Sequence, residues 1–219
     1  MSSLTNLLNL NREWSESVHA AEPDFFEKLR QQQRPKYLWV GCSDSRVPAN
    51  QIVGLLPGEL FVHRNVANLV IHTDLNCLSV LQYAVDVLQV EHVIVCGHYG
   101  CGGVEAALTR KPFGLIDNWL RHIQDLLIAY KPQMDAVSAE DQLDRLCELN
   151  VVSQAANICR TTIVQSAWQR GQQISVHAWV YRLTDGLLHD LDFCVDAEND
   201  TEKSYEAAAA KLFAAPSSR

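Results

Sequence analysis

Four side chains of the types that bind metals occur in two short groups, each placed directly after an apolar run that ends in glycine. Cys42 and Asp44 form the first group, and His98 and Cys101 form the second. If the two runs are neighbouring strands of an open α/β sheet, these side chains meet at the strand ends, where such sheets build their sites. Two thiolates, one imidazole and one carboxylate suit tetrahedral Zn²⁺. Buried thiols beside a hydrogen-bonded histidine are the alternative for either group alone, and the matched placement favours the metal.

Apolar patterning and turn residues predict the elements that hold these groups. Strands are expected over residues 37–40, 60–63, 93–96, 174–181 and 187–195. Helices are expected over residues 3–20, 24–32, 75–88, 102–108, 115–130, 139–170 (broken) and 207–215, with a short helix after Pro48. Strand, helix and strand in this order give right-handed crossovers, and the Asp185-Gly186 turn makes the last strand antiparallel. The fold class is therefore α/β, with a mainly parallel central sheet, an antiparallel edge strand, flanking helices and an N-terminal helical arm.

One domain is expected for residues 1–219, with the N-terminal helical arm over residues 1–34 and a C-terminal tail over residues 196–219. The arm carries an apolar stripe at helical spacing. This stripe either packs on a second subunit of a dimer or covers its own domain, and the sequence leaves both open.

The composition points to a small partner and a reducing compartment. The net charge is −8 with an isoelectric point near 5.4, whereas nucleic-acid and anionic membrane surfaces need an excess of Lys and Arg. No apolar run approaches the ~18 residues of a membrane span, and no signal segment opens the sequence. Seven cysteines, an odd number, do not resemble a disulfide framework, so a cytoplasmic protein with free thiols is expected. Five of them are expected to be small buried hydrophobic residues: Cys77, Cys96, Cys147, Cys159 and Cys194.

Three longer motifs contain these groups or lie between them. In chain order they are Cys42-Ser-Asp-Ser-Arg46, Phe61-Val-His-Arg-Asn-Val-Ala-Asn68 and Cys96-Gly-His-Tyr-Gly-Cys-Gly-Gly103. Together they resemble the motifs of the β-class carbonic anhydrases over about residues 23–195, and the resemblance is closest to the bacterial enzymes regulated by bicarbonate. It implies reversible hydration of CO2 to bicarbonate and a proton by attack of zinc-bound hydroxide, with one zinc per subunit in a homodimer or homotetramer.

The resemblance also implies roles for single residues. Cys42, His98 and Cys101 match the family's zinc ligands, and Asp44 with Arg46 matches its Asp–Arg dyad. A carboxylate two positions from a ligand either binds the zinc and closes the site, or turns away to pair with the arginine and leaves the site open. In the open state the carboxylate accepts a hydrogen bond from the nucleophile and orients it toward CO2.

Further matches concern the pocket and a second anion site. The resemblance implies a substrate pocket lined by Gln33, Phe61, Val66 and Tyr83, with some of this lining coming from the neighbouring subunit of a dimer, and core packing is the alternative for Phe61 and Val66. The Gln33 amide and the Gly102 backbone N–H are expected to stabilise charge on the bicarbonate oxygens. The noncatalytic bicarbonate site of the regulated members matches Trp39, Arg64 and Tyr181. Packing of Trp39 and Tyr181 against helices is the alternative there.

Two other functions stay open at this point. A hydrolase of another cumulated substrate such as CS2 uses the same metal site and differs in access to its pocket. A noncatalytic, zinc-stabilised interaction module needs neither a displaceable Asp44 nor Arg46, and it has no use for an apolar pocket beside the metal. All three features are predicted here, which favours the enzyme.

Overall fold

The computed structural model describes residues 3–31 and 34–214. The chain divides into two units, residues 1–34 and residues 35–219. The first unit contains helices α1 (Ser3–Ala21) and α2 (Phe25–Gln31), which contact each other through the edge-to-face rings of Trp14 and Phe26, 5.7 Å apart. The expected helical arm is therefore present. Its apolar stripe is exposed, and Leu4, Leu7 and Leu8 each keep more than half of their surface accessible.

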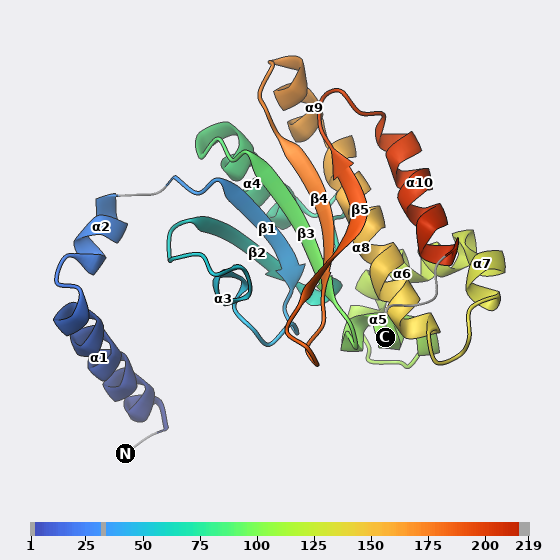
Figure 1. The fold of residues 1–219 in the computed structure, drawn as a ribbon. Coiled ribbons are helices and arrows are strands. Elements are labelled where there is room, and N and C mark those ends of the chain that lie inside the picture. The colour runs from blue at the N-terminus through green and yellow to red at the C-terminus, as the bar shows by residue number, and fades with distance from the viewer. Residues whose placement is uncertain (1–2, 32–33, 215–219) are drawn as a thin grey trace. The chain divides into compact units, whose positions relative to one another are not determined.

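The second unit is built on a five-stranded sheet with the order β2-β1-β3-β4-β5 (Figure 1). Its strands are β1 (Tyr37–Cys42), β2 (Leu60–Asn65), β3 (His92–His98), β4 (Ser175–Tyr181) and β5 (Leu188–Val195). The first four pair in parallel, and β5 pairs antiparallel with β4 at the edge. The predicted α/β class, with its mainly parallel sheet and antiparallel edge strand, is confirmed.

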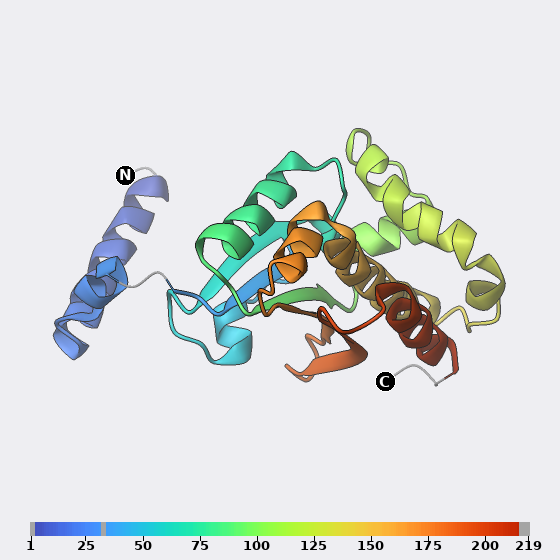
Figure 2. The ribbon, with the colours of Figure 1, turned by 90° about the horizontal axis from the view of Figure 1, so that it is seen from above.

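Helices cover the sheet unequally. Those of the second unit are α3 (Ala49–Val53), α4 (Leu75–Gln82), α5 (Gly102–Thr109), α6 (Ile116–Ala129), α7 (Lys131–Asp135), α8 (Gln142–Arg160), α9 (Thr162–Gln169) and α10 (Thr201–Ala214). The main core lies under α8, which packs on β3, β4 and β5. Viewed along the sheet, α4 (green) and α3 (cyan) lie on opposite sides of it (Figure 2). A smaller core containing Trp39, Ile94 and Tyr181 lies on the α3 side.

The buried position of α8 is visible in its neighbours. The strand residues that face it, such as Val95 and Ala178, are fully buried. At Gly97 an added Cβ would lie 2.4 Å from the Val151 side chain of α8, so only glycine admits this close approach. The approach brings α8 against the last residues of β3, immediately before His98.

Two helix predictions need correction. The helix expected over residues 75–88 ends as an α-helix at Gln82 and continues as a π-turn, η2 (Tyr83–Val87), in which the Leu88 N–H bonds the Tyr83 carbonyl at 3.0 Å. Residues 196–219, expected as a tail, contain α10, which begins before residue 207 and packs on α8 and β5. The break expected within residues 139–170 falls at Thr161, whose side chain caps α9.

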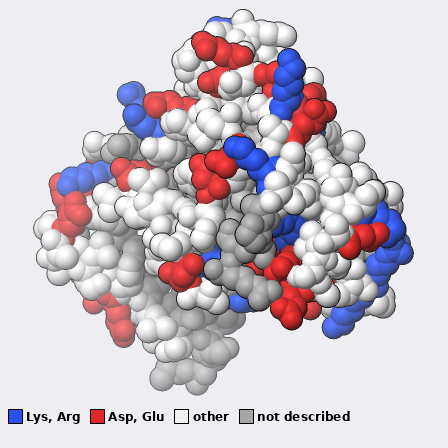
Figure 3. Space-filling view, turned by 45° about the vertical axis from the view of Figure 1, so that its right-hand side comes forward, with Lys and Arg blue, Asp and Glu red and all other residues white. Residues whose placement is uncertain are grey.

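The prediction of five buried cysteines is wrong for Cys194, which is exposed, and holds for the other four. The reason is strand alternation: Leu191, Phe193 and Val195 of β5 face the core, so the side chain between the last two points away from it. On the face shown in Figure 3, acidic and basic side chains are interspersed over much of the surface. No helix within the described residues is long and apolar enough to cross a membrane.

Candidate metal centre

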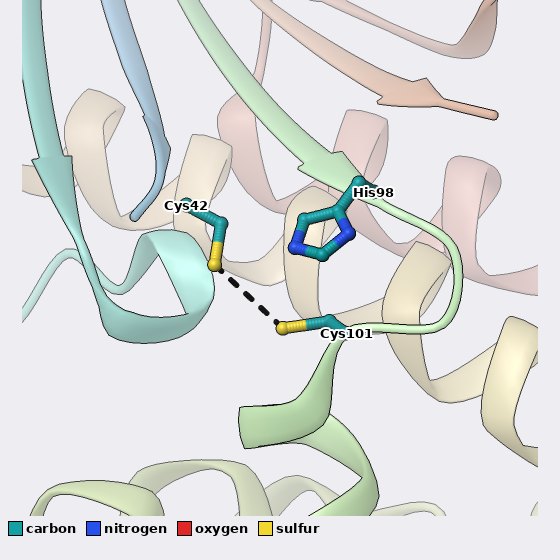
Figure 4. A group of neighbouring side chains, drawn as sticks. All are labelled: Cys42, His98 and Cys101. Carbon is teal, nitrogen blue, oxygen red and sulfur yellow. Dashed lines mark hydrogen bonds between the residues drawn. The ribbon is translucent and has the colours of Figure 1, made fainter. Parts of the chain in front are cut away.

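The two predicted groups meet because β1 and β3 are direct neighbours in the sheet. Cys42 ends β1, His98 ends β3, and Cys101 lies just before the first residue of α5. All three side chains are buried, and their ligand atoms all lie within 4.8 Å of one another. The two sulfurs are 3.7 Å apart, with the imidazole ring of His98 beside them (Figure 4). Two thiols and one imidazole thus converge on one point at the carboxyl edge of the sheet.

The imidazole of His98 is prepared to bind a metal through Nε2. Its Nδ1 lies 3.2 Å from the carbonyl oxygen of Tyr99, which fixes Nδ1 as the N–H donor. Nε2 is buried and has no hydrogen-bond partner in the part of the chain that the structure describes. A buried nitrogen lone pair without a partner is costly, and a metal ion satisfies it. The Cys₂His donor set therefore fits Zn²⁺ with a fourth position left for water or substrate.

The pKa values of the two thiols are shifted in opposite directions. The pKa of Cys42 is lowered to about 4, mainly by the hydrogen bond with the Cys101 thiol. The backbone N–H groups of Asp44 and Ala67, 3.4 and 3.2 Å from the Cys42 sulfur, add to this effect against the cost of burial. The pKa of Cys101 is raised by the same pairing and by burial. Because a metal binds cysteine as thiolate, Cys101 must lose its proton when a metal binds, whereas Cys42 is already deprotonated at neutral pH.

Asp44 lies outside the group of three in this structure. Its carboxylate pairs with Arg46 at 3.7 Å, and both side chains are partly exposed. A Cβ added to Gly102 would lie 3.8 Å from Asp44 Oδ2, which places the carboxylate at the beginning of α5. Arg46 has a left-handed backbone with φ of 63°. Asp44 and Arg46 are thus paired with each other in this structure.

The residues expected to line the pocket lie on three elements. The rings of Phe61 on β2 and Tyr83 at the beginning of η2 contact each other, with centroids 5.8 Å apart. Val66 lies in the short turn η1 (Val66–Asn68), and its side chain would be 3.0 Å from a Cβ added to Gly103. It is therefore next to residues 98–101, which carry His98 and Cys101 and are called the metal loop below. Gln33 falls outside the described residues. An apolar side chain therefore lies beside the metal loop, and a pair of aromatic rings lies where β2 meets η2.

The residues expected to bind a second anion lie on three strands: Trp39 in the middle of β1, Arg64 near the end of β2 and Tyr181 at the end of β4. Trp39 and Tyr181 are nearly buried and belong to the smaller core. Arg64 donates to the carbonyl oxygen of Cys42 at 2.9 Å and to the Ser45 hydroxyl. Arg64 therefore contacts the backbone of a candidate metal ligand.

A buried polar network behind the metal loop was not anticipated. The Tyr99 hydroxyl donates to Glu148 of α8 at 2.6 Å, and Glu148 pairs with Arg145 at 2.7 Å. The Arg182 guanidinium lies over the Tyr99 ring, 4.0 Å from its centroid. Burial raises the pKa of Glu148. The signal available in the sequence was the alternation of charged and apolar residues in this helix, where Arg145 and Glu148 flank Leu146 and Cys147, because charged side chains among buried neighbours need buried partners.

A second group of ligand-type side chains occurs at the beginning of α4. The ligand atoms of His63, Asp74 and Cys77 also lie within 4.8 Å of one another. Asp74 already caps the helix, since its Oδ1 accepts the N–H of Asn76 at 3.0 Å. The positive end of the helix dipole lies at this point and disfavours a cation. The metal is therefore assigned to the first group.

Fold and donor set define an α/β protein with a Cys₂His centre at the carboxyl ends of parallel strands. Comparison with known proteins gives the family. A family model described as carbonic anhydrase matches residues 37–188. A carbonic anhydrase of Emericella nidulans is 48% identical over 83% of this chain and 80% of its own length, and one of Candida albicans is 36% identical over 91% and 72%. The solved Coccomyxa β-carbonic anhydrase in complex with acetazolamide has 38% identity and a TM-score of 0.85, covering 93% of this chain and 96% of its own.

The chain therefore belongs to the β-class carbonic anhydrase family. It is an enzyme, a lyase whose reaction is the hydration of CO2. Both relatives named above are fungal, so the likeness supports the β class as a whole and leaves the bacterial, bicarbonate-regulated subgroup a prediction. The noncatalytic module considered from the sequence is set aside.

Proposed function

We propose that this carbonic anhydrase hydrates CO2 reversibly with one Zn²⁺ per subunit, bound by Cys42, His98 and Cys101. The observation that carries the proposal is the unpartnered, buried Nε2 of His98 beside two thiols. When bound, zinc acts as a Lewis acid that lowers the pKa of a water molecule, so that a nucleophile is available near neutral pH. Two thiolates offset the charge of the ion, in contrast to three neutral histidines, so we expect an alkaline optimum.

The Asp44–Arg46 dyad orients the nucleophile in this proposal. Paired with Arg46, the carboxylate lies at the beginning of α5 and is free to accept a hydrogen bond from the nucleophile. If Asp44 leaves Arg46 and turns to the metal, it fills the fourth position and stops the reaction. The exposure of both side chains is consistent with a carboxylate that exchanges between the two positions.

The remaining residues bind a neutral substrate and a charged product. Val66 provides an apolar surface next to the loop that carries His98 and Cys101. Phe61 pairs with Leu38, four residues before Cys42 in β1, so we propose that the ring pair of Phe61 and Tyr83 lines the pocket of a neighbouring subunit. Gly102 is the first residue of α5, and its N–H is one of the donors left free at a helix N-terminus. This donor stabilises the charge that develops on the bicarbonate oxygens. Gln33 is proposed for the same task.

The test is the rate of CO2 hydration measured by stopped flow on zinc-replete protein between about pH 6.5 and 9. Wild-type protein should hydrate CO2 rapidly at alkaline pH. Asp44→Asn should keep its zinc and lose at least about 100-fold in rate, because an amide does not orient the nucleophile in the same way. Asp86→Asn is the matched control, since Asp86 forms an exposed ion pair with Arg170. A zinc-loaded wild type without activity, or equal rates in both variants, would contradict the proposal.

We also propose that bicarbonate binds at Trp39, Arg64 and Tyr181 and inhibits the enzyme at low pH. Indole, guanidinium and phenol groups are suitable donors to an anion. An anion that binds the Arg64 guanidinium competes with the hydrogen bond that Arg64 donates to the Cys42 carbonyl. Loss of that bond would alter the position of Cys42, a candidate metal ligand. Bicarbonate inhibits only if it binds the closed state, with Asp44 on the metal, more tightly than the open state.

Replacement of Trp39 tests this regulation. Trp39→Ala should retain activity at pH values where bicarbonate silences the wild type, and its pH profile should be shallower. Trp179→Ala is the control, because this indole lies 6.5 Å from Trp39 on the same face. An unchanged pH profile of CO2 hydration in Trp39→Ala would contradict the proposed regulation by bicarbonate.

Assembly and location complete the proposal. We propose a homodimer or homotetramer, supported by the exposed apolar stripe of α1 and by the likeness to one of two tetrameric β-carbonic anhydrases from Sordaria macrospora. That solved structure shares 33% identity and a TM-score of 0.81 over 88% of this chain and 98% of its own. We propose a cytoplasmic location because all seven cysteines are free thiols, as a reducing compartment keeps them.

A further inference from the structure

Helix α8 carries a ladder of buried amide side chains against residues 67–70. Asn150 is fully buried, and its Nδ2 donates to the carbonyl oxygen of Ala67 at 2.9 Å. One turn further, Gln154 Nε2 donates to Asn150 Oδ1 at 3.1 Å, and Gln154 Oε1 accepts the N–H of Val70 at 2.8 Å. The ladder therefore holds the segment at two separate points, Ala67 through Asn150 and Val70 through Gln154.

Ala67 is held in a backbone conformation that residues with a Cβ rarely adopt. Its φ and ψ are 65° and 24°, and Asn68 after it is also left-handed with φ of 48°. Such conformations persist where the surrounding structure fixes them. Asn150 fixes Ala67 from the carbonyl side, and the Trp119 indole holds the preceding carbonyl, that of Val66, at 2.9 Å.

This conformation aims the Ala67 N–H at the metal centre. The nitrogen lies 3.2 Å from the Cys42 sulfur and donates a hydrogen bond to it. A hydrogen bond to a thiolate draws electron density away from the sulfur, so the sulfur donates less charge to a bound metal. The Lewis acidity of the metal then depends on the position of a backbone N–H that Asn150 holds from the other side of the peptide chain.

We propose that Asn150 is a positioning residue of the metal centre, which acts through Ala67 to maintain the N–H···S bond to Cys42 and so keeps the bound metal acidic. The inference rests on the proposed zinc function. Gln154 provides the internal comparison: it is also nearly buried, belongs to the same ladder and grips the same segment, but at Val70. The sulfur should respond to loss of Asn150 and not to loss of Gln154.

The experiment compares Asn150→Leu with Gln154→Leu in the full-length protein loaded with Co²⁺ in place of zinc. Leucine has the same branched arrangement of side-chain heavy atoms as asparagine and is nearer to glutamine in volume, and it removes the hydrogen bonds of either amide. The thiolate-to-cobalt charge-transfer absorption should move to longer wavelength in Asn150→Leu, because the sulfur becomes a stronger donor, and it should stay unchanged in Gln154→Leu. If Asn150→Leu does not accumulate as folded protein, Asn150→Ala removes the same donor with less crowding and carries the same expectation.

A further readout follows the same logic. The midpoint of the pH profile for CO2 hydration should move to higher pH in this variant alone.

The outcomes separate the two proposals. If wild-type protein shows no thiolate-to-cobalt absorption, the metal assignment fails and the role of Asn150 fails with it. If the wild type shows the absorption and Asn150→Leu leaves it unchanged, only the role of Asn150 is overturned and the metal assignment stands. Equal shifts in both variants would mean that any loosening of residues 67–70 reaches the sulfur, which also overturns a specific role for Asn150.

Discussion

Replacement of Gly97 by alanine should destabilise the protein, because β3 and α8 approach each other too closely at this position to admit a methyl group. An added Cβ would lie 2.4 Å from Val151 Cγ2 and 3.3 Å from Asn68 Oδ1. Real Cβ atoms essentially never show the first distance, and Val151 is fully buried. Gly97 has no left-handed φ, so the strain comes from packing and not from the backbone.

The expected magnitude follows from the cost of overpacking a filled core. An extra buried methyl group costs about 1–3 kcal/mol, whereas the same change at an unstrained site stabilises a protein by about 0.4–1 kcal/mol through the unfolded chain. The steric cost exceeds the gain from the unfolded chain, because α8 packs on β3, β4 and β5 and cannot shift away from Gly97 without disturbing those contacts. We therefore expect Gly97→Ala to lower the free energy of unfolding by about 1–3 kcal/mol.

The assay is urea unfolding followed by circular dichroism at fixed protein and zinc concentrations, because bound metal raises apparent stability. Val151→Ala is the matched partner. Alone it should cost about 2 kcal/mol through lost burial and a cavity. In the double variant the new methyl group occupies part of the space that the valine vacates, so the two costs should not add.

Either of two results would refute this reasoning. A Gly97→Ala protein as stable as the wild type would show that α8 yields without cost. Strictly additive effects of Gly97→Ala and Val151→Ala would show that the two side chains do not compete for the same space.

Other features of the structure give three further predictions. Cys42→Ser should reduce bound zinc from one ion per chain to almost none at micromolar zinc, as measured by elemental analysis, since it removes one of three candidate ligands; normal zinc content would contradict the assigned centre. Burial and the nearby His92 lower the pKa of His177, so the folded state favours neutral His177; this stability is complete above about pH 6.5 and lost as the pH falls further. His177→Asn should therefore show a smaller loss of urea stability between about pH 7 and 5 than the wild type, and an equal loss would refute the assignment. Tyr99→Phe removes a donor to the buried Glu148 and should cost about 1–3 kcal/mol in the same unfolding assay; a variant with unchanged stability would show that the bond contributes nothing net.

Local patterns in the sequence were sufficient for the fold class and for the three converging ligands. The runs before Cys42 and His98 are short and apolar, and each ends in glycine, which predicts adjacent parallel strands with side chains at their ends. The turn at residues 185–186 likewise predicted the antiparallel edge strand β5. These features depend on neighbours in the chain, so periodicity and turn chemistry report them directly.

The same reasoning failed where an environment is set by distant residues. Cys194 was expected to be buried because its neighbours are apolar, yet on an edge strand alternate side chains face outward. The C-terminal helix was expected only from residue 207, yet α10 begins at Thr201, and it packs on α8 and β5.

The tertiary structure alone revealed how the metal centre is supported. Ala67 and Asn150 are separated by 83 positions, and Tyr99 and Glu148 by 49, so no local pattern relates them. The left-handed backbone at Ala67 is equally hidden, because alanine does not favour it and only the surrounding contacts hold it. The sequence by itself therefore determined which side chains could bind a metal. The tertiary structure decided how those side chains are held, because α8 packs against residues 67–70 and against Tyr99. A buried hydrogen bond forms only where folding brings donor and acceptor together.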